Sequence, residues 1–170
     1  MAIPVVNGDG CLDYRDDPYP TTLLELYDRF VDGSVHRTER ERIFSALRLQ
    51  AELMNEAAGQ APTWIGGDFL SFTNEPPRHA ITVYQCRDLD HMMAILDHDG
   101  WPSLLTLRDG FVSSPAATGI IRLKPVGGLV DAFLATPKTQ PYWQGICSSG
   151  RDPDGQVLVP RRQGFVEVTV

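Results

Sequence analysis

The sequence predicts a single α+β domain spanning residues 1–170, because helical patterns come first and strand-like patterns follow them. Between residues 22 and 58, apolar residues recur at steps of three and four, the spacing of one helix face. After residue 60 the chain carries short runs rich in β-branched and aromatic residues. Hydrophobic residues make up 42% of the 170 positions, so the chain can bury one core.

Residues 1–20 are expected to form an irregular N-terminal arm, since glycines and prolines interrupt them repeatedly. The first helix is expected to begin at Thr22. The Thr22 hydroxyl can accept a hydrogen bond from the amide of Glu25, while the Glu25 carboxylate accepts one from the amide of Thr22, forming a capping box. The helix is expected to end near Gly33, and its apolar side comprises Leu23, Leu26, Tyr27 and Phe30.

A second, longer helix is expected to start with another capping box at Thr38-Glu39-Arg40-Glu41 and to end at Gly59. Its apolar stripe consists of Ile43, Ala46, Leu47, Gln50, Leu53, Met54 and Ala57. Charges of both signs alternate from Arg37 to Arg42, which is typical of a solvated helix face. We expect the two N-terminal helices to pack on the sheet through their apolar sides.

The rest of the chain is expected to combine strands with a third helix. Strands are expected at residues 63–65, 79–84, 119–123 and 164–170, and the third helix at residues 92–96 at least. A glycine-containing turn follows the first of these strands, and Asp88 is expected to cap the third helix. Residues 128–135, which continue toward Tyr142-Trp143, fit either a strand or a helix by their pattern.

Composition excludes several classes of protein. The net charge of −7 argues against nucleic acid as a partner, because phosphate binding needs clustered Lys and Arg. No apolar run approaches the ~20 residues of a membrane helix, and the N-terminus has no secretory pattern, so a cytoplasmic protein is expected. The three cysteines include no C-x-x-C pair, which favours neither a zinc site nor a disulfide framework. Cys86 is expected to be a small buried residue.

Four segments, in order along nearly the whole chain, carry a family resemblance. The first is Ile3-Pro4 with Asn7-Gly8-Asp9-Gly10-Cys11-Leu12. The second is Thr22-Leu23-Leu24-Glu25-Leu26 with Arg29-Phe30-Val31 and Arg37. The third is Trp64-Ile65-Gly66-Gly67-Asp68-Phe69 with Pro76-Pro77 and Ile81-Thr82-Val83. The fourth is Tyr142-Trp143, Arg151-Asp152, Gly155 and Gly164-Phe165-Val166-Glu167-Val168. Together they resemble a family of small, largely uncharacterised bacterial proteins with a nucleotidyltransferase fold, akin to the polymerase-beta-like superfamily.

The resemblance implies a mixed β-sheet and a particular active site. In such enzymes a glycine–serine turn holds nucleotide phosphates, because backbone amides approach a ligand closely where no side chain intervenes. Two aspartates, separated by one residue on the next strand, share divalent metals with a third carboxylate from a later strand. Without these ligands the reaction loses nearly all of its electrostatic stabilisation.

The chain departs from that pattern at the residues that carry the chemistry. Asp68 stands where the family has serine, so a negative charge faces the anion site. The two aspartate positions fall on Ala80 and Thr82, and a shift by one residue gives His79 and Ile81. Neither register provides two carboxylates on one face of the strand.

Residues 119–124 offer cations in place of a third carboxylate. We therefore expect no catalytic residue, no metal ligand and no cofactor. What remains is a vestigial nucleotide pocket consisting of Gly66, Gly67, Asp68, Phe69, Ala80 and Thr82.

Other acidic and histidine residues suggest alternative sites. Asp88 and Asp90 are again separated by one residue, but they open a helix, where capping and the helix dipole favour aspartate. His79, His91 and His98 are spaced by twelve and seven residues, which matches no zinc motif. An ion pair between Asp68 and His79 across the turn is a further hypothesis.

Three functional hypotheses follow. The leading one is a catalytically inactive nucleotidyltransferase-fold protein that binds a protein, as in defence or toxin–antitoxin modules, or holds a nucleotide without turnover. The runner-up is an active Mg²⁺-dependent transferase that uses Asp68 with Asp88 or Asp90. The third is a homodimeric assembly protein that pairs through apolar surface around Trp101 or Trp143. The sequence leaves the oligomeric state open.

Overall fold

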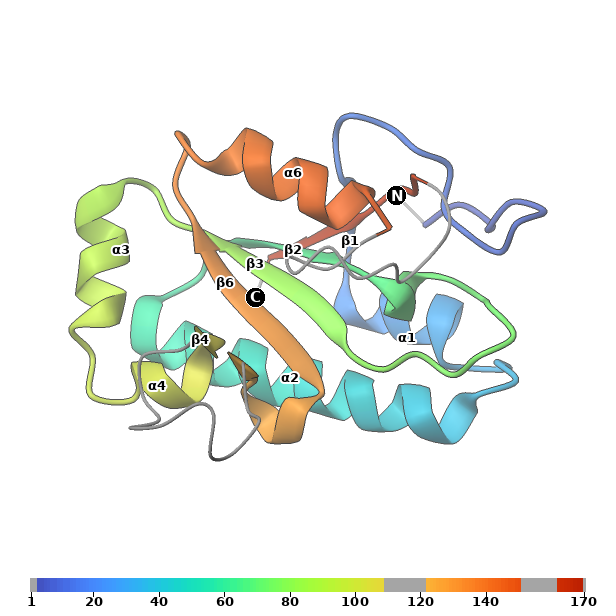
Figure 1. Cartoon of the computed structure of the whole chain (residues 1–170), viewed down its shortest axis with the longest axis horizontal. Helices are drawn as coiled ribbons and strands as arrows, with labels where there is room; N and C mark the ends of the chain where they lie inside the picture. Colours follow the sequence, from blue (N-terminus) through green and yellow to red (C-terminus); the bar gives the residue numbers. More distant parts are fainter. Residues whose placement is uncertain (1–2, 109–121, 151–161, 170) are drawn as a thin grey trace.

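A mixed five-stranded sheet runs through the middle of the molecule (Figure 1). The computed structural model describes residues 3–108, 122–150 and 162–169. The strands are β1 (Tyr19–Thr21), β2 (Pro62–Gly66), β3 (Ala80–Gln85), β6 (Val130–Ala135) and β7 (Val166–Thr169). They lie in the order β1-β7-β2-β3-β6, where β2 is antiparallel to both its neighbours and the two outer pairs are parallel. The predicted α+β class with a mixed sheet is confirmed.

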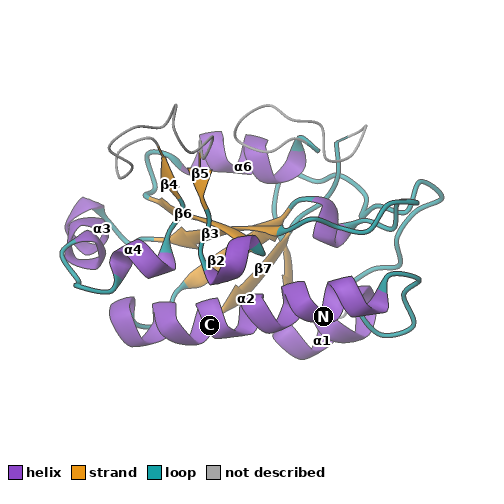
Figure 2. Cartoon of the chain, turned by 60° about the horizontal axis from the view of Figure 1, so that its bottom comes forward, coloured by secondary structure: helices purple, strands orange, loops and turns teal. Residues whose placement is uncertain are grey.

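Helices cover both faces of the sheet (Figure 2). The N-terminal helices α1 (Leu23–Phe30) and α2 (Arg37–Ala58) lie on one face, and α6 (Gln140–Ser148) lies on the other. Shorter helices α3 (Leu89–Leu96) and α4 (Trp101–Leu104) lie toward the C-terminal end of α2. The remaining elements are the 3₁₀ turns η1 (Asp68–Leu70) and η2 (Val126–Gly128) and a small sheet of β4 (Leu107–Arg108) with β5 (Arg122–Leu123).

Helix starts were predicted with mixed success. The Thr22–Glu25 capping box is present at α1, and Asp88 caps α3 by accepting the amide of His91 at 2.7 Å. The capping box predicted at Thr38 is wrong, because α2 already begins at Arg37 and no side chain caps it. The Glu41 carboxylate, which that capping box requires, instead accepts the Nε of Arg37 at 2.8 Å.

Several segments differ from the expectation or complete it. Residues 130–135 form strand β6, whereas Tyr142 and Trp143 belong to helix α6, so the ambiguous segment contains both. The N-terminal arm is not irregular throughout, because Tyr19 and Pro20 pair with β7. Helix α4 and strand β4 were not predicted; both are too short for a periodic pattern to emerge. Residues 119–121, 151, 152 and 155 lie outside the described residues.

The core forms where the apolar stripe of α2 meets the sheet. The buried positions of α2 are Arg40, Ile43, Ala46, Leu47, Gln50, Ala51 and Met54, which repeat at helical spacing. The carboxyl end of the helix is tied to β3, because the Tyr84 hydroxyl donates to the carbonyl oxygen of Gly59 at 2.6 Å. Cys86 is buried after β3, as predicted. Among the described residues, no helix combines the length and the apolar character needed to cross a bilayer.

One charged side chain lies inside this core. Arg40 is 1% exposed, and its guanidinium donates to the carbonyl oxygens of Phe30, Phe69 and Ser71. These carbonyls belong to the end of α1, to η1 and to the residue after it, so one side chain joins α1, α2 and the turn after β2. Burial lowers the pKa of Arg40 to about 10, and the nearby charge of Asp68 acts in the opposite direction.

Replacing Arg40 with Met should destabilise the fold strongly. The substitution leaves three carbonyl oxygens without their donor and removes the positive charge near the Asp68 carboxylate, a loss of about 3–5 kcal/mol. Urea unfolding followed by circular dichroism measures the change in the free energy of unfolding. The matched control is Arg42→Met on the exposed side of the same helix, expected within about 0.5 kcal/mol of wild type. Equal stability of the two variants would contradict the role assigned to Arg40.

Candidate functional site

The glycine turn after β2 is the first part of the candidate site. Strand β2 ends at Gly66. The next residue, Gly67, has a φ of +90°, a backbone conformation that residues with a Cβ rarely adopt. A Cβ on Gly66 would lie 3.0 Å from the Cα and the carbonyl oxygen of Cys147 in α6. The close approach that Gly66 permits is therefore made by helix α6 of the same chain.

Asp68, in the next position, points into the protein. It is 5% exposed, and its Oδ2 accepts the backbone amide of Arg78 at 3.2 Å and lies 3.5 Å from the Nε of that residue. Its charge also acts on the buried Arg40. Asp68 thus serves as the counter-charge of two arginines. The predicted ion pair with His79 is not the one formed, because the arginines already neutralise Asp68.

The two faces of β3 carry different residues. Tyr84 reaches the end of α2, and the two-residue period of a strand places Thr82 and Ala80 on that same face. The opposite face holds Ile81 and Gln85. Ile81 pairs with Gly66 and would contact a Cβ on Gly67, while Gln85 accepts the side-chain amide of Gln140 in α6 at 3.2 Å.

The six residues of the vestigial pocket therefore do not surround one cavity. Gly66 and Gly67 lie on the α6 side of the sheet, whereas Ala80 and Thr82 are buried on the α2 side. Phe69 is 0% exposed and belongs to the core. The alternative register falls on His79, just before β3, and on Ile81, which lies on the face of the glycine turn; neither is a carboxylate.

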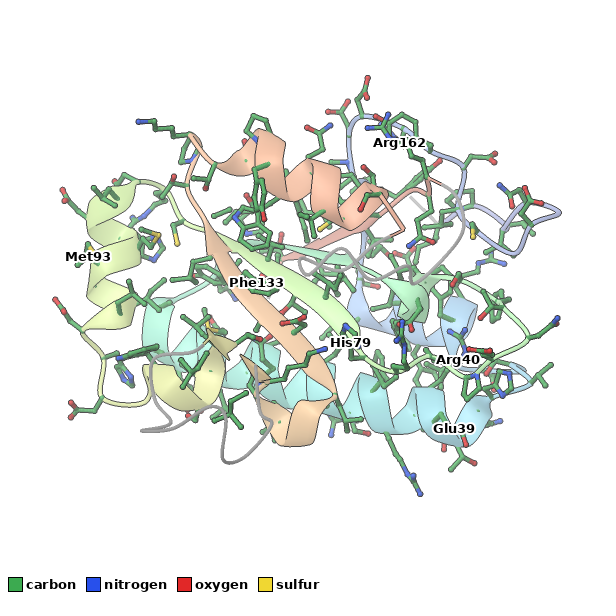
Figure 3. The ribbon with its side chains drawn as sticks, viewed as in Figure 1. Glu39, Arg40, His79, Met93, Phe133 and Arg162 are labelled. Carbon is green, nitrogen blue, oxygen red and sulfur yellow. The ribbon has the colours of Figure 1, made fainter. Side chains whose placement is uncertain are left out.

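A buried carboxylate lies beside these positions. Asp131 of β6 pairs with Ile81 in the parallel register and is 0% exposed. Its Oδ1 accepts the hydroxyl of Thr106 at 2.7 Å, and its Oδ2 lies 3.5 Å from the Nζ of Lys124 and 3.9 Å from the Nε2 of His79. Figure 3 shows His79 where β3 begins. We refer to Asp131, Lys124, His79 and Thr106 as the Asp131 cluster.

The Asp131 cluster was missed because the pattern of residues 128–135 did not separate strand from helix. A signal was present, since Asp131 is the only charged residue in the run Leu129-Val130-Asp131-Ala132-Phe133-Leu134. A lone carboxylate in an apolar run is rarely buried without a partner. The expectation that residues 119–124 supply cations is met by Lys124, and the tertiary structure places that cation against Asp131.

The alternative acidic residues lie elsewhere. Asp88 caps α3 after β3, while Asp68 precedes β3, so the six residues of that strand separate them by roughly 20 Å. Asp90 lies in the first turn of α3 and is exposed. Within residues 3–108, 122–150 and 162–169, no group of three or more His, Cys, Asp or Glu side chains is arranged to hold a metal ion.

Four surface hollows lie away from the glycine turn. The largest, about 560 Å³, lies between the exposed side of α2 and the segment from Val126 to Leu129. The other three have volumes of about 260, 260 and 140 Å³; residues of α1 or α2 line each of them in part, and the smallest is also lined by residues of α4. None of the four is lined by a residue of the vestigial pocket. Trp143 stacks on Phe133, labelled in Figure 3, with ring centroids 4.6 Å apart, and Trp101 packs against the core.

Comparison with known proteins assigns no family to the chain, so the assignment that stands is the α+β class of its fold. No protein-family model matches the chain, and neither a curated protein nor a solved structure matches it. The resemblance to nucleotidyltransferases therefore stays a prediction. The structure itself defines an α+β protein with a mixed five-stranded sheet, a packed glycine turn and a buried Asp131 cluster.

Replacing Gly66 with Ala tests the packing of the glycine turn. The added methyl group would meet backbone atoms of Cys147 at 3.0 Å, so α6 must move, at a cost of about 1–3 kcal/mol. Gly145→Ala in α6 is the control, because nothing lies within 4 Å of its Cβ and alanine favours a helix. Chemical denaturation should show a loss for Gly66→Ala and none for Gly145→Ala. If both variants are as stable as wild type, α6 does not pack against the glycine turn.

Two buried thiols give a pH-dependent test. Burial raises the pKa of Cys147 to about 12, and burial with the charge of Asp88 raises that of Cys86 to about 11. Because these folded values exceed the ordinary one, deprotonation opposes folding, and stability should decline as pH rises above roughly 9. At pH 8 both thiols should resist a disulfide reagent until the protein is unfolded. Rapid labelling of both in the native protein, mapped by mass spectrometry, would refute this.

Proposed function

We propose that the chain is a catalytically inactive nucleotidyltransferase-fold protein that acts by binding another protein. The observation that carries this proposal concerns the alternative register of the two aspartate positions. It falls on His79, which immediately precedes β3, and on Ile81 of β3, which pairs with Gly66, and neither is a carboxylate. A pair of divalent metals cannot be shared there, and metal sharing is the central chemistry of nucleotide transfer.

The arrangement of elements supports the nucleotidyltransferase part of the proposal. Helix α2 leads into β2, the glycine turn follows, and β3 returns antiparallel beside β2. A later strand, β6, then lies parallel to β3 and carries Asp131 on the face of Ile81. This is the order of strand, turn and carboxylate strand that the resemblance implies, with the two carboxylates of β3 replaced. The later strand that would match the third carboxylate is then β6 with Asp131, in place of the residues 119–124 assigned from the sequence.

A protein partner is favoured over a nucleotide because the glycine turn is already packed. Helix α6 occupies the space beside Gly66, and Asp68 points into the protein, where its carboxylate contacts Arg78. A nucleotide would need backbone amides that are open to its phosphates. The net charge of −7 further disfavours a polyanionic ligand.

A second candidate is a nucleotide held without turnover. It is supported by Lys124 and His79, which place two groups able to carry positive charge on the same face as the glycine turn. A nucleotide could use them only if α6 or Asp131 gave way. We therefore rank this candidate second.

The test of inactivity is a transfer assay on the full chain. Purified protein is incubated with labelled nucleoside triphosphates, Mg²⁺ or Mn²⁺, and RNA or protein acceptors. We expect no transfer above that of the Asp131→Asn variant, because no pair of carboxylates positions a metal. Metal-dependent transfer by wild type that this variant loses would overturn the proposal.

The binding part is tested with a partner isolated by crosslinking in the native cell. The partner is then purified and titrated against the chain by calorimetry, with ATP and GTP titrated in parallel. A saturable complex with the protein and none with either nucleotide is the expected result. Micromolar binding of a nucleotide in the absence of any protein complex would favour the second candidate instead.

A further inference from the structure

The charges around Asp131 differ from those of a divalent-cation site. Its carboxylate is 0% exposed, and the side chain of Lys124 is 20% exposed, so the ammonium reaches inward from the surface. His79, whose side chain is 5% exposed, approaches the same oxygen, Oδ2. Thr106 donates its hydroxyl to the other oxygen. Both carboxylate oxygens therefore face groups that donate protons or carry positive charge.

These surroundings do not fit Mg²⁺ or Mn²⁺. Such hard cations require several oxygen ligands, usually including more than one carboxylate. The neighbouring β3 positions offer an imidazole and an aliphatic side chain. An ammonium 3.5 Å from the only carboxylate of the cluster would also repel an incoming cation, and this repulsion is strong where water is excluded.

We infer that the Lys124 ammonium permanently takes the place of a divalent cation beside Asp131. A buried carboxylate needs a partner to remain charged. A lysine ammonium is part of the chain and, unlike a metal ion, cannot dissociate from it. Lysine suits this role because its charge is compact, whereas the arginine guanidinium is a wide planar fork. The inference rests on the proposed function in one respect: it explains how the fold keeps Asp131 after the loss of catalysis.

The consequence is a protein whose folded state is indifferent to divalent metal. A metal-bound carboxylate would make the melting temperature depend on metal concentration, since a ligand of the native state stabilises it by mass action. An internal ammonium makes the same contribution at any metal concentration.

The first experiment titrates the intact wild-type chain with Mn²⁺, followed by electron paramagnetic resonance and by thermal unfolding. We expect no saturable Mn²⁺ uptake up to millimolar concentration and no change in the melting temperature on adding EDTA, Mg²⁺ or Mn²⁺. Saturable uptake in wild type that Asp131→Asn abolishes would overturn the inference. The titration of the wild-type chain gives a result even if the variants fail to fold.

The second experiment asks whether Lys124 neutralises Asp131. Lys124→Met should lower the melting temperature by roughly 5–10 °C, because it removes the ammonium that lies 3.5 Å from a buried carboxylate. The chain contains one other lysine, Lys138, which is exposed, so Lys138→Met is the matched control and should be near wild type. If Lys124→Met has the same melting temperature as Lys138→Met, the inference fails.

A double-mutant cycle separates the ion pair from the rest of the packing. Asp131→Asn and Lys124→Met should each destabilise the protein, and the double variant should lose clearly less than the sum of the two. Additive losses would mean that the two side chains act independently, which would also overturn the inference.

The failure of this inference and the failure of the proposed function are distinguishable. Asp131-dependent uptake of Mn²⁺ without any nucleotide transfer would reject the ammonium replacement and leave the inactive binding protein intact. Metal-dependent nucleotide transfer would reject the proposed function itself.

Discussion

The buried guanidinium of Arg40 is the constraint on which the rest of this structure depends. A charge that is 1% exposed must find acceptors inside the protein, and it finds them on Phe30, Phe69 and Ser71. Those three carbonyl groups can be reached together only if α1, α2 and the turn after β2 hold fixed positions. The negative charge of Asp68 next to this guanidinium then completes the arrangement. A residue that looked like a charge facing an anion site is thus part of the core.

The same inward use of polar groups extends across the candidate site. Gly66 allows helix α6 to approach, Asp68 balances arginines, and Asp131 faces Lys124, His79 and Thr106. Each of these residue types could in principle serve a ligand, through a bare amide, a carboxylate or an ammonium. Here their described contacts are with the chain itself.

Local signals predicted local structure well, and failures came where several partners compete for one side chain. The capping box at Thr22 and the cap at Asp88 depend on neighbours within three residues, so the sequence contains all the information required. The box at Thr38 has the same pattern, but Arg37 competes for Glu41 and wins because it places a full charge against the carboxylate. Strand β6 was ambiguous because five apolar residues around one aspartate fit both the strand and the helix period.

By itself, the sequence determined the α+β class, the two N-terminal helices with their apolar stripes, the strands on either side of the glycine turn and the absence of a carboxylate pair in either register of β3. Only the tertiary structure decided which register faces that turn. Strand side chains alternate with a period of two, so a shift of one residue exchanges Ala80 and Thr82 for His79 and Ile81. The tertiary structure also placed Lys124 beside Asp131 and α6 beside Gly66. No local sequence pattern links these segments, so their contacts could not be predicted from the sequence.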